Sequence, residues 1–257
     1  MFSASIDSIA IGRTTIVRSV EFMALPGEVT AIIGPNGSGK STLLKGLSGD
    51  LHFKGRVAIN GQDSRSLKSW ETASLRAVLP QHSTLSFPFT VREVVAMGLT
   101  GGRSGVSMAE REWLPERALE RVDLAGFAGR FYGDLSGGEQ QRVQLARVLC
   151  QVWQPVLDGA PRYLLLDEPV SSLDVKHQIL VMKIARNFAD AGGGVVAILH
   201  DLNLAGRFAD RILAMRKGTA AGFGAPDDVL TDERMTDVFD CAIRFHRDEA
   251  GLFVRLG

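Results

Sequence analysis

The sequence predicts an α/β fold with a mixed sheet, an antiparallel β flap and an inserted α-helical subdomain. Short apolar runs that end at turn residues alternate along the chain with helical stretches. Three of these runs show little alternation of polar and apolar residues, which is typical of parallel strands covered on both faces. Asn60-Gly61 indicates a tight hairpin turn, and residues 82–152 are dominated by helix-like stretches.

The expected strands share a short run of strand-forming residues that stops at a turn residue. They are residues 29–33, 57–60, 163–166, 195–199 and 212–215. The expected helices are residues 41–47 and 175–187, with residues 91–97, 109–122 and 139–152 inside the helical segment. A glycine-rich loop lies at residues 101–105. Residues 154–162 contain two prolines and Asp158-Gly159, which predicts a surface loop before the next strand.

Composition and charge exclude several classes of protein. The chain has 257 residues, of which 45% are hydrophobic and 23% charged, and these values exclude a mainly disordered, collagen-like or disulfide-stapled chain. The 29 basic and 29 acidic residues cancel. The chain as a whole therefore has no electrostatic attraction to nucleic acid or anionic lipid, and we expect no nucleic-acid partner.

Targeting and cysteine patterns indicate the cytosol as the expected compartment. No apolar run approaches the ~20 residues that a helix needs to cross a bilayer. The N-terminus carries an acidic residue where a secretory signal would be basic. Cys150 and Cys241 are far apart, which argues against a disulfide framework and against a cysteine metal cluster.

The segment after the first of the apolar strands fits the phosphate-binding pattern G-x-x-x-x-G-K-[ST]. It reads Gly34-Pro35-Asn36-Gly37-Ser38-Gly39-Lys40-Ser41, and Thr42 follows within the next helix. Such a loop directs backbone N–H groups at phosphate oxygens, and the following helix adds its positive end. Lys40 is expected to reach the β- and γ-phosphates, and the Ser41 hydroxyl to bind Mg²⁺. A chance glycine-rich turn is the alternative, but the strand before and the helix after favour nucleotide binding.

Two adjacent carboxylates follow the strand at residues 163–166. In a sheet of this kind, ligands bind at the carboxyl ends of the strands. Asp167 is therefore a candidate for holding Mg²⁺, directly or through water, and Glu168 for the general base that polarises the attacking water. An acidic pair after a strand is more often a simple turn, and it is the phosphate-binding loop in the same chain that favours a catalytic role.

A third motif opens a helix near the end of the helical segment. Ser136 is followed three residues later by Glu139, which is the pattern of a capping box. Gly137 and Gly138 would let a ligand approach the free N–H groups of the helix. From the spacing alone, a well-capped helix without a ligand is the simpler interpretation.

The order of the motifs resembles that of ATP-binding cassette (ABC) ATPases, and the resemblance covers essentially the whole chain. The third motif is similar to the signature of that family, and other motifs follow the family order: Gln81 at the Q-loop, Asp174 in Ser171-Ser172-Leu173-Asp174 at the D-loop, and His200 at the switch histidine. The resemblance implies a single domain over residues 1–257. It would have a P-loop NTPase (RecA-like) core of residues 1–81 and 153–257, and a helical insertion of residues 82–152 that carries the signature.

The resemblance also implies roles for these residues. Gln81 would contact Mg²⁺ or the attacking water and lie at the contact with a membrane subunit. Asp174 would belong to the loop that crosses between two ATP sites, and His200 would contact the γ-phosphate. The phosphate-binding loop of one chain and residues 136–138 of another would close on the same ATP, so a homodimer is implied, with ATP and Mg²⁺ as cofactors.

Two residues depart from the family pattern. Ile11 precedes Gly12 at the place where the family usually has an aromatic residue that stacks on adenine. The contact with the base is therefore left open, with Arg13 or the neighbouring apolar face as alternatives. Glu139 replaces the commoner glutamine of the signature. Because residues 136–138 are the ones that face phosphate, we expect this change to affect capping more than catalysis.

Further similarities concern the transported cargo. Residues 79–81, followed by residues 87–93, look like the importer branch that serves iron-siderophores, haem and vitamin B12. Residues 146–149, Trp153 and residues 161–163 look most like bacterial haem (hemin) importer ATPases, which favours haem over a ferric siderophore or cobalamin. The implied partners are two transmembrane permease subunits and a periplasmic substrate-binding protein, at the cytoplasmic face of the inner membrane. The alternatives are a soluble ABC ATPase of iron-sulfur assembly, DNA repair or translation, and a small-molecule P-loop kinase, which gives no role to the signature.

Overall fold

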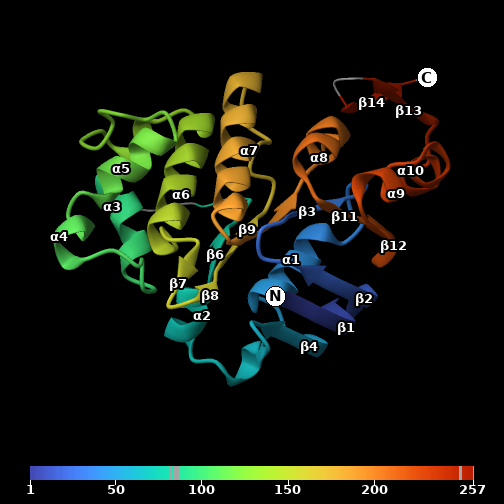
Figure 1. Ribbon diagram of the computed structural model, residues 1–257, viewed down its shortest axis with the longest axis horizontal. Coiled ribbons are helices and arrows are strands. Elements are labelled where there is room, and N and C mark those ends of the chain that lie inside the picture. Colours follow the sequence, from blue (N-terminus) through green and yellow to red (C-terminus); the bar gives the residue numbers. More distant parts are fainter. Residues whose placement is uncertain (82, 84–86, 249–250, 257) are drawn as a thin grey trace.

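A six-stranded sheet lies at the centre of the protein, whose computed structural model describes residues 1–81, 83, 87–248 and 251–256 (Figure 1). The strands of this sheet run in the order β12 (Thr219–Gly224), β11 (Arg211–Arg216), β3 (Val29–Ile33), β10 (Gly194–Ile198), β9 (Tyr163–Leu166) and β6 (Arg76–Leu79). All neighbouring pairs are parallel except β11 and β12. The prediction of a mixed sheet is confirmed.

The two faces of this sheet are covered by different layers. Ala31 and Ile33 of β3 lie in one hydrophobic core with helices of that side, and Ile32 lies in a second core with helix α1 (Lys40–Ser48). Every residue of β3 is buried. Because successive side chains of a strand point to opposite faces, a strand covered on both sides must be apolar throughout. This double cover explains the continuous apolar run in the sequence.

The second layer is a four-stranded antiparallel sheet. It runs in the order β2 (Thr14–Ala24), β1 (Phe2–Ile11), β4 (Phe53–Ile59) and β5 (Gln62–Asp63). Asn60 and Gly61 have φ values of 51° and 83° and join β4 to β5, which confirms the predicted hairpin. Strands β1 and β2 are not among the expected strands, so the flap is larger than expected.

Helices α3 (Val91–Ala96), α5 (Leu114–Arg121) and α6 (Gly137–Gln151) lie together on one side of the molecule in Figure 1. The predicted helix over residues 109–122 is interrupted, because the chain forms α4 (Met108–Arg111) and then α5. Pro115 lies in the first turn of α5. Proline has no N–H to donate to the carbonyl four residues earlier, so a single helix cannot run through this point. Residue 82, the predicted start of the helical segment, lies outside the described residues.

The remaining elements complete the layers. The helices are α2 (Ser69–Leu75), α7 (Val175–Asp190), α8 (Leu202–Phe208), α9 (Pro226–Val229), α10 (Asp232–Phe239) and the short 3₁₀ turns η1 (Ser64–Ser66), η2 (Met97–Leu99) and η3 (Tyr132–Asp134). The predicted surface loop at residues 154–162 contains a small hairpin of β7 (Val156–Leu157) and β8 (Ala160–Pro161), and β13 (Ile243–Asp248) pairs with β14 (Gly251–Leu256) near the C-terminus.

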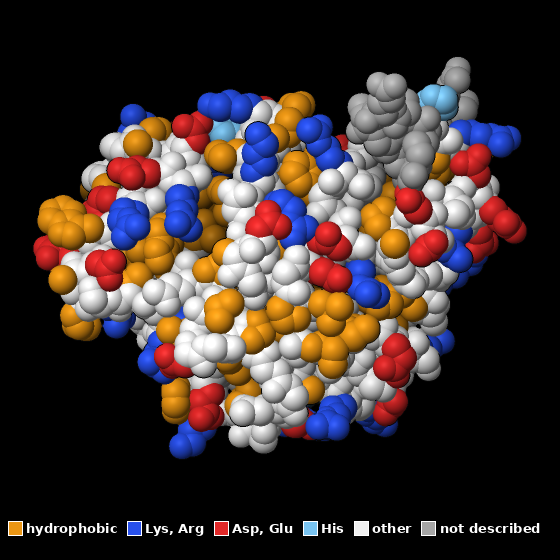
Figure 2. Space-filling view, viewed as in Figure 1, with side chains coloured by type: hydrophobic (Ala, Val, Ile, Leu, Met, Phe, Trp, Pro, Cys, Tyr) orange, Lys and Arg blue, Asp and Glu red, His pale blue; other side chains and the backbone are white. Residues whose placement is uncertain are grey.

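Charged side chains of both signs are interspersed over the face shown in Figure 2, which agrees with the net charge of zero. Among the described residues, no helix combines the length and the apolar character that a membrane span requires.

Candidate functional site

Four neighbouring strands end at the site, and each is followed by a residue that the sequence motifs singled out. In the sheet order β3, β10, β9, β6, the residues are Gly34 after β3, His200 after β10, Asp167 after β9 and Gln81 after β6. All four strands are parallel, so their carboxyl ends meet at one edge of the sheet. Segments that lie far apart in the sequence are thereby brought to one place.

The phosphate-binding loop is held tightly against its surroundings. Gly34 has a φ of 145°, and a Cβ atom at this position would collide with the backbone carbonyl of Met215. Gly39 has a φ of 99°, and a Cβ atom there would lie 3.2 Å from Cγ2 of Val17. Positive φ values are accessible to glycine at little cost. Gly34 and Gly39 are thus required by both conformation and space, whereas Gly37, with a φ of 77° and open space around it, is favoured by conformation alone.

Lys40 begins α1, is 5% exposed and points back onto the loop. Its Nζ donates to the carbonyl oxygens of Gly34 at 2.8 Å and Pro35 at 2.9 Å. Burial lowers the pKa of Lys40, and the negative charges of Glu168 and Asp167 oppose this effect. The ammonium group therefore lies against backbone oxygens of the loop, within the electrostatic influence of two acidic residues.

Ser41 and Asp167 are brought together across 126 positions of the sequence. The Ser41 hydroxyl donates to Oδ1 of Asp167 at 3.1 Å. Asp167 is 3% exposed, and burial raises its pKa, although the hydrogen bond from Ser41 acts in the opposite direction. A hydroxyl oxygen next to a carboxylate is the type of donor set that Mg²⁺ prefers. The residues present therefore fit a magnesium ion.

Glu168 and His200 are in close contact at this edge. Oε1 of Glu168 lies 2.6 Å from Nε2 of His200, and the two side chains are 14% and 41% exposed, respectively. The backbone of Glu168 is left-handed, with a φ of 52°. Such a conformation is uncommon for a residue other than glycine and is often found at functional sites. Glu168 is thus a largely buried carboxylate that the surrounding structure holds in an unusual backbone conformation.

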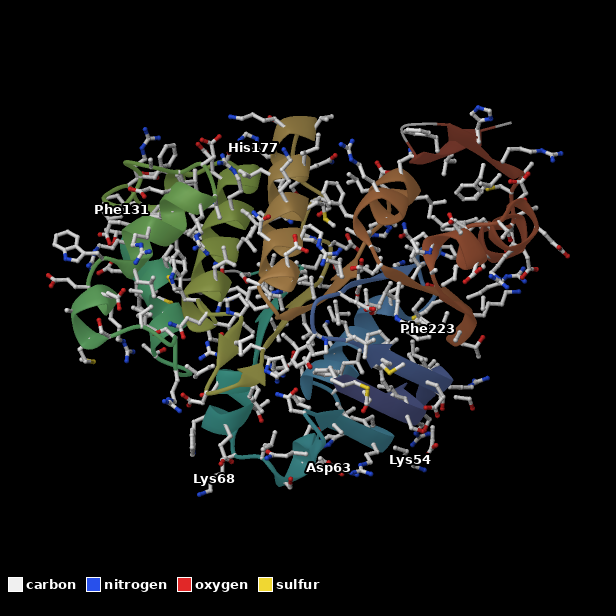
Figure 3. The ribbon with its side chains drawn as sticks, viewed as in Figure 1. Lys54, Asp63, Lys68, Phe131, His177 and Phe223 are labelled. Atoms are coloured by element: carbon white, nitrogen blue, oxygen red, sulfur yellow. The ribbon has the colours of Figure 1, made fainter. Side chains whose placement is uncertain are left out.

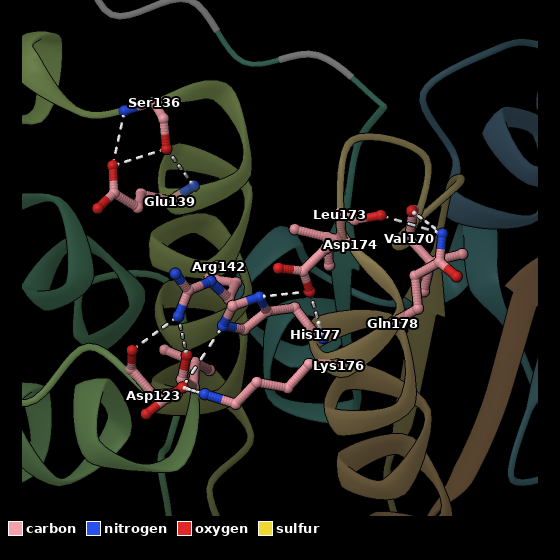
Figure 4. Close-up of polar contacts among 11 residues, drawn as sticks. Asp123, Ser136, Glu139, Arg142, Val170, Leu173, Asp174, Lys176, His177 and Gln178 are labelled. Atoms are coloured by element: carbon pink, nitrogen blue, oxygen red, sulfur yellow. Dashed lines mark hydrogen bonds and ion pairs between the residues drawn. The ribbon is translucent and has the colours of Figure 1, made fainter.

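The signature residues begin α6 as the capping-box pattern predicts (Figure 4). The Ser136 hydroxyl accepts a hydrogen bond from the Glu139 backbone N–H, and Oε2 of Glu139 accepts from the backbone N–H of Ser136 at 2.8 Å. Gly137 is exposed, and a Cβ atom there would meet nothing within 4 Å. Gly138 lies closer to its surroundings, because a Cβ atom there would come within 3.1 Å of the Ser172 carbonyl oxygen.

In the described part of one chain, the signature and the phosphate-binding loop are not hydrogen-bonded to each other. Among the described residues, no hydrogen bond joins residues 136–138 to residues 34–42. Gln81 is exposed and lines a cavity of about 300 Å³ together with Gly137 and Ser172. The chain therefore brings the Q-loop, the signature and the D-loop to one cavity. Ile11, at the end of β1, is 54% exposed.

A polar network that the sequence analysis missed holds Asp174 at the start of α7 (Figure 4). The Asp174 carboxylate accepts from the backbone N–H of His177 at 2.9 Å and lies 2.8 Å from its Nδ1. Nε2 of His177 lies 3.4 Å from Asp123, which also accepts from Lys176 at 2.6 Å. Arg142 of α6 donates to the backbone carbonyl of Asp123 at 2.7 Å. The His177 side chain, labelled in Figure 3, thereby links the D-loop to the end of α5.

A second missed residue contacts the acidic pair. Nε2 of Gln141, on the first turns of α6, donates to the backbone carbonyl of Glu168 at 2.9 Å. The sequence signal for Gln141 and His177 is weak, because their partners Glu168 and Asp123 lie far from them in the sequence. The remaining signal is that Gln141 and His177 lie within a few residues of Ser136 and Asp174, respectively.

Comparisons with known proteins show to which family the chain belongs. A family model described as ABC transporter matches residues 17–171. The hemin import ATP-binding protein HmuV of Mesorhizobium japonicum is 64% identical over 244 residues, which are 95% of this chain and 93% of that protein. The protein of the same name from Chelativorans sp. is 59% identical over the same shares of both chains.

Solved structures show the same fold. A structure titled as an ATP binding subunit of an ABC transporter superposes with a TM-score of 0.78 and 23% identity, over 94% of this chain and 95% of that one. A dimeric bacterial ABC transporter cassette gives a TM-score of 0.74 and 27% identity, over 88% of this chain and 99% of that one. The α/β fold is therefore that of ABC ATPase domains, and the chain belongs to the ABC transporter family.

Proposed function

We propose that this chain is the ATP-hydrolysing subunit of a membrane importer and that it energises uptake of haem (hemin). The observation that carries the ATPase part is the convergence of two pairs at the edge of the sheet. Ser41 contacts Asp167 at 3.1 Å, and the next residue, Glu168, lies 2.6 Å from His200. A phosphate-binding loop beside these pairs is the arrangement that nucleoside triphosphate hydrolysis requires.

Different residues of the chain have different roles in hydrolysis. Residues 34–42 bind the phosphates through backbone N–H groups, and Lys40 turns its ammonium group to the β- and γ-phosphates. Ser41 and Asp167 are the residues that would hold Mg²⁺, with Gln81 as a further ligand. When bound there, Mg²⁺ supplies positive charge against the phosphate oxygens. The rate comes from positioning and electrostatics, without a covalent intermediate.

Glu168 acts as the general base in this proposal. Its carboxylate orients the attacking water and accepts a proton from it, while His200 holds the carboxylate and contacts the γ-phosphate. The short contact between Glu168 and His200 and the low exposure of Glu168 support this assignment. A fixed carboxylate needs little reorganisation free energy when the water attacks the γ-phosphate.

A second copy of the chain completes each site. Within one chain, residues 136–138 make no hydrogen bond to residues 34–42 among the described residues, and Gly137 is exposed with open space around it. These features support a homodimer in which the signature of one copy binds the phosphates held by the other, with Asp174 crossing between the sites. The dimeric cassette among the structural relatives supports the same arrangement.

The proposal also includes the domain organisation and the partners of the chain. We assign residues 1–257 to one ATPase domain, with a core of residues 1–81 and 153–257 and a helical insertion of residues 82–152. The partners would be two transmembrane permease subunits and a periplasmic substrate-binding protein, with the chain bound peripherally at the cytoplasmic face of the membrane. The names of the relatives, which are hemin import proteins, favour haem as the cargo.

The ATPase assignment is tested with the purified chain. Glu168→Gln should retain ATP binding but lower turnover by roughly 10²-fold or more, because the base is lost while the shape is kept. Lys40→Ala should lose ATP binding. Phosphate release and binding of a fluorescent ATP analogue measure the two effects. Substantial turnover by Glu168→Gln would remove Glu168 from the role of base.

The cargo is tested separately, in vesicles that contain the chain together with the permease encoded beside it. ATP should drive uptake of labelled haem, and Glu168→Gln should abolish it. Uptake of cobalamin or of a ferric siderophore without uptake of haem would contradict the haem assignment and leave the ATPase assignment intact.

A further inference from the structure

The side-chain amide of Gln141 is hydrogen-bonded to the backbone of the proposed general base. Its Nε2 donates to the carbonyl oxygen of Glu168 at 2.9 Å, from a residue 27 positions away in the sequence. The same carbonyl oxygen accepts from the Ser171 hydroxyl at 3.2 Å and lies 3.4 Å from the Ser171 backbone nitrogen. Gln141 is the only one of these donors that comes from another element, helix α6.

The backbone that Gln141 holds is in an unfavourable conformation. Glu168 has a φ of 52°, and a residue with a Cβ atom persists in this region only where its surroundings hold it there. This backbone conformation sets the direction of the peptide group after Glu168, in the segment that follows β9. A donor fixed on a helix is well suited to hold the Glu168 carbonyl in this direction. The amide must present its nitrogen, because the Oε1 atom in the same place would set two acceptors against each other.

The rest of the Gln141 amide indicates a role beyond packing. Its Oε1 atom is buried and has no hydrogen-bond partner among the described residues. Gln141 also lines the cavity of about 300 Å³ that Gln81 and Gly137 share. A buried amide oxygen without a partner costs stability. Among the described residues, the bond to Glu168 is thus the hydrogen bond that holds the Gln141 side chain.

We propose that Gln141 is a positioning residue for ATP hydrolysis, which fastens the backbone of Glu168 to the helix that begins with the signature. This inference rests on the proposed ATPase function and adds a residue to it. The contact acts within one chain. The start of α6 thus contacts both the general base of its own chain, through Gln141, and the ATP of the partner copy, through residues 136–138. Movement of α6 would be transmitted to Glu168 by a hydrogen bond.

The first test compares two neighbouring glutamines. Gln141→Met keeps the length and removes the donor, and Gln140→Met is the matched control. Nε2 of Gln140 donates to the backbone carbonyls of Tyr132 and Leu135, so that variant loses two hydrogen bonds without touching Glu168. We expect Gln141→Met to lower kcat about tenfold, because small displacements of a catalytic group are costly. The KM for ATP should stay within about twofold, because phosphate binding is unchanged.

Folding is checked independently for both variants. Melting temperature and binding of a fluorescent ATP analogue should be alike in Gln141→Met and Gln140→Met. Gln141→Asn supplies a second variant, in which the amide is kept but is one methylene too short to reach the carbonyl, and the same loss of kcat is expected. Equal kcat in the Gln141 and Gln140 variants would overturn the role of Gln141. No turnover by the unsubstituted chain would instead contradict the proposed function.

A mixed dimer separates action within one chain from action on the partner. One copy carries Glu168→Gln, so that a single competent base remains in the other copy. Gln141→Met is then placed either in the copy that keeps Glu168 or in the copy that supplies the signature to that site. We expect the loss of kcat only in the first arrangement. A loss only in the second arrangement would show that Gln141 acts on the partner's ATP and would overturn the proposal.

Discussion

At the scale of single residues, the site is built from charged groups that have been withdrawn from water. Lys40 is held by two carbonyl oxygens, and burial lowers its pKa. Asp167 is also buried, and its pKa is raised. In the proposed reaction, ATP would replace neutral carbonyl acceptors around Lys40 with charged phosphate oxygens, which form stronger hydrogen bonds to an ammonium group. The positive charge that ATP would meet is thus already held in the loop before ATP binds.

The two cysteines differ in burial, and this difference predicts their reactivity. Cys150 is fully buried on α6, and burial raises its pKa to about 12, whereas Cys241 is exposed. The thiolate is the reactive form of cysteine, and a raised pKa suppresses it. We expect iodoacetamide to modify Cys241 alone in the folded protein and both cysteines in denaturant, as measured by intact mass.

The control for this labelling is Cys241→Ser, which should remain unmodified in the native state. Raising the pH to about 9 should not make Cys150 reactive, because this pH is still far below the pKa of its thiol and the side chain stays buried. Rapid native labelling of Cys150 would show that α6 opens from its neighbours.

At the scale of elements, helices of the helical segment share one way of starting. Three helices begin with a capping box, formed by a hydroxyl residue and a glutamate three positions later. The pairs are Thr90 with Glu93 at α3, Ser107 with Glu110 at α4 and Ser136 with Glu139 at α6. Hydrogen bonds from the hydroxyl residue lower the pKa of each glutamate below its ordinary value of 4.5. The same motif thus starts an ordinary helix and the signature helix.

These capping boxes predict a pH dependence of stability. A glutamate with a lowered pKa stabilises the fold fully above 4.5, and this contribution is lost as the pH falls through its lower value in the folded state. The triple variant Glu93→Gln, Glu110→Gln, Glu139→Gln should therefore be less stable than the parent at about pH 7, and the difference should shrink at about pH 3. Urea denaturation followed by circular dichroism measures both. A difference that is constant with pH would show that the charges of these residues do not contribute.

At the scale of the whole molecule, sequence reasoning predicted the central sheet better than its surroundings. Residues 29–33 and 163–166 form strands with the expected bounds, because strands buried on both faces leave a continuous apolar signal. The long strands β1 and β2 gave no such signal: buried and exposed residues are mixed along both. The break before α5 was also missed, although Pro115 offered a local reason for it.

The candidate site, like the fold, was predictable from the sequence only in part. The motifs identified the loops that follow four strands, and parallel pairing brought those loops to one edge of the sheet. The link from Gln141 to Glu168 and the link from His177 to Asp123 depend on how helices pack against one another. Such contacts have no local sequence pattern, since they join residues 27 and 54 positions apart. Local chemistry was therefore predictable, and the coupling between elements was not.

The arrangement of the whole molecule predicts that Gly137 matters between copies and not within one. A Cβ atom at Gly137 would meet nothing within 4 Å in the single chain, so Gly137→Val should fold normally and bind ATP. If residues 136–138 approach the partner's phosphates closely, the added side chain should block that approach. Gly133 gives the matched control, because it is also exposed and has the same open surroundings.

The measurement uses the Glu168→Gln background, in which ATP should trap the dimer. Sedimentation velocity with ATP should show dimers for this background and for its Gly133→Val derivative, and monomers for its Gly137→Val derivative. Melting temperatures without nucleotide should agree among the three, because an added Cβ atom would meet nothing within 4 Å at either glycine. A dimer that forms equally well with valine at position 137 would contradict close contact between this residue and the partner's ATP, and with it the shared site.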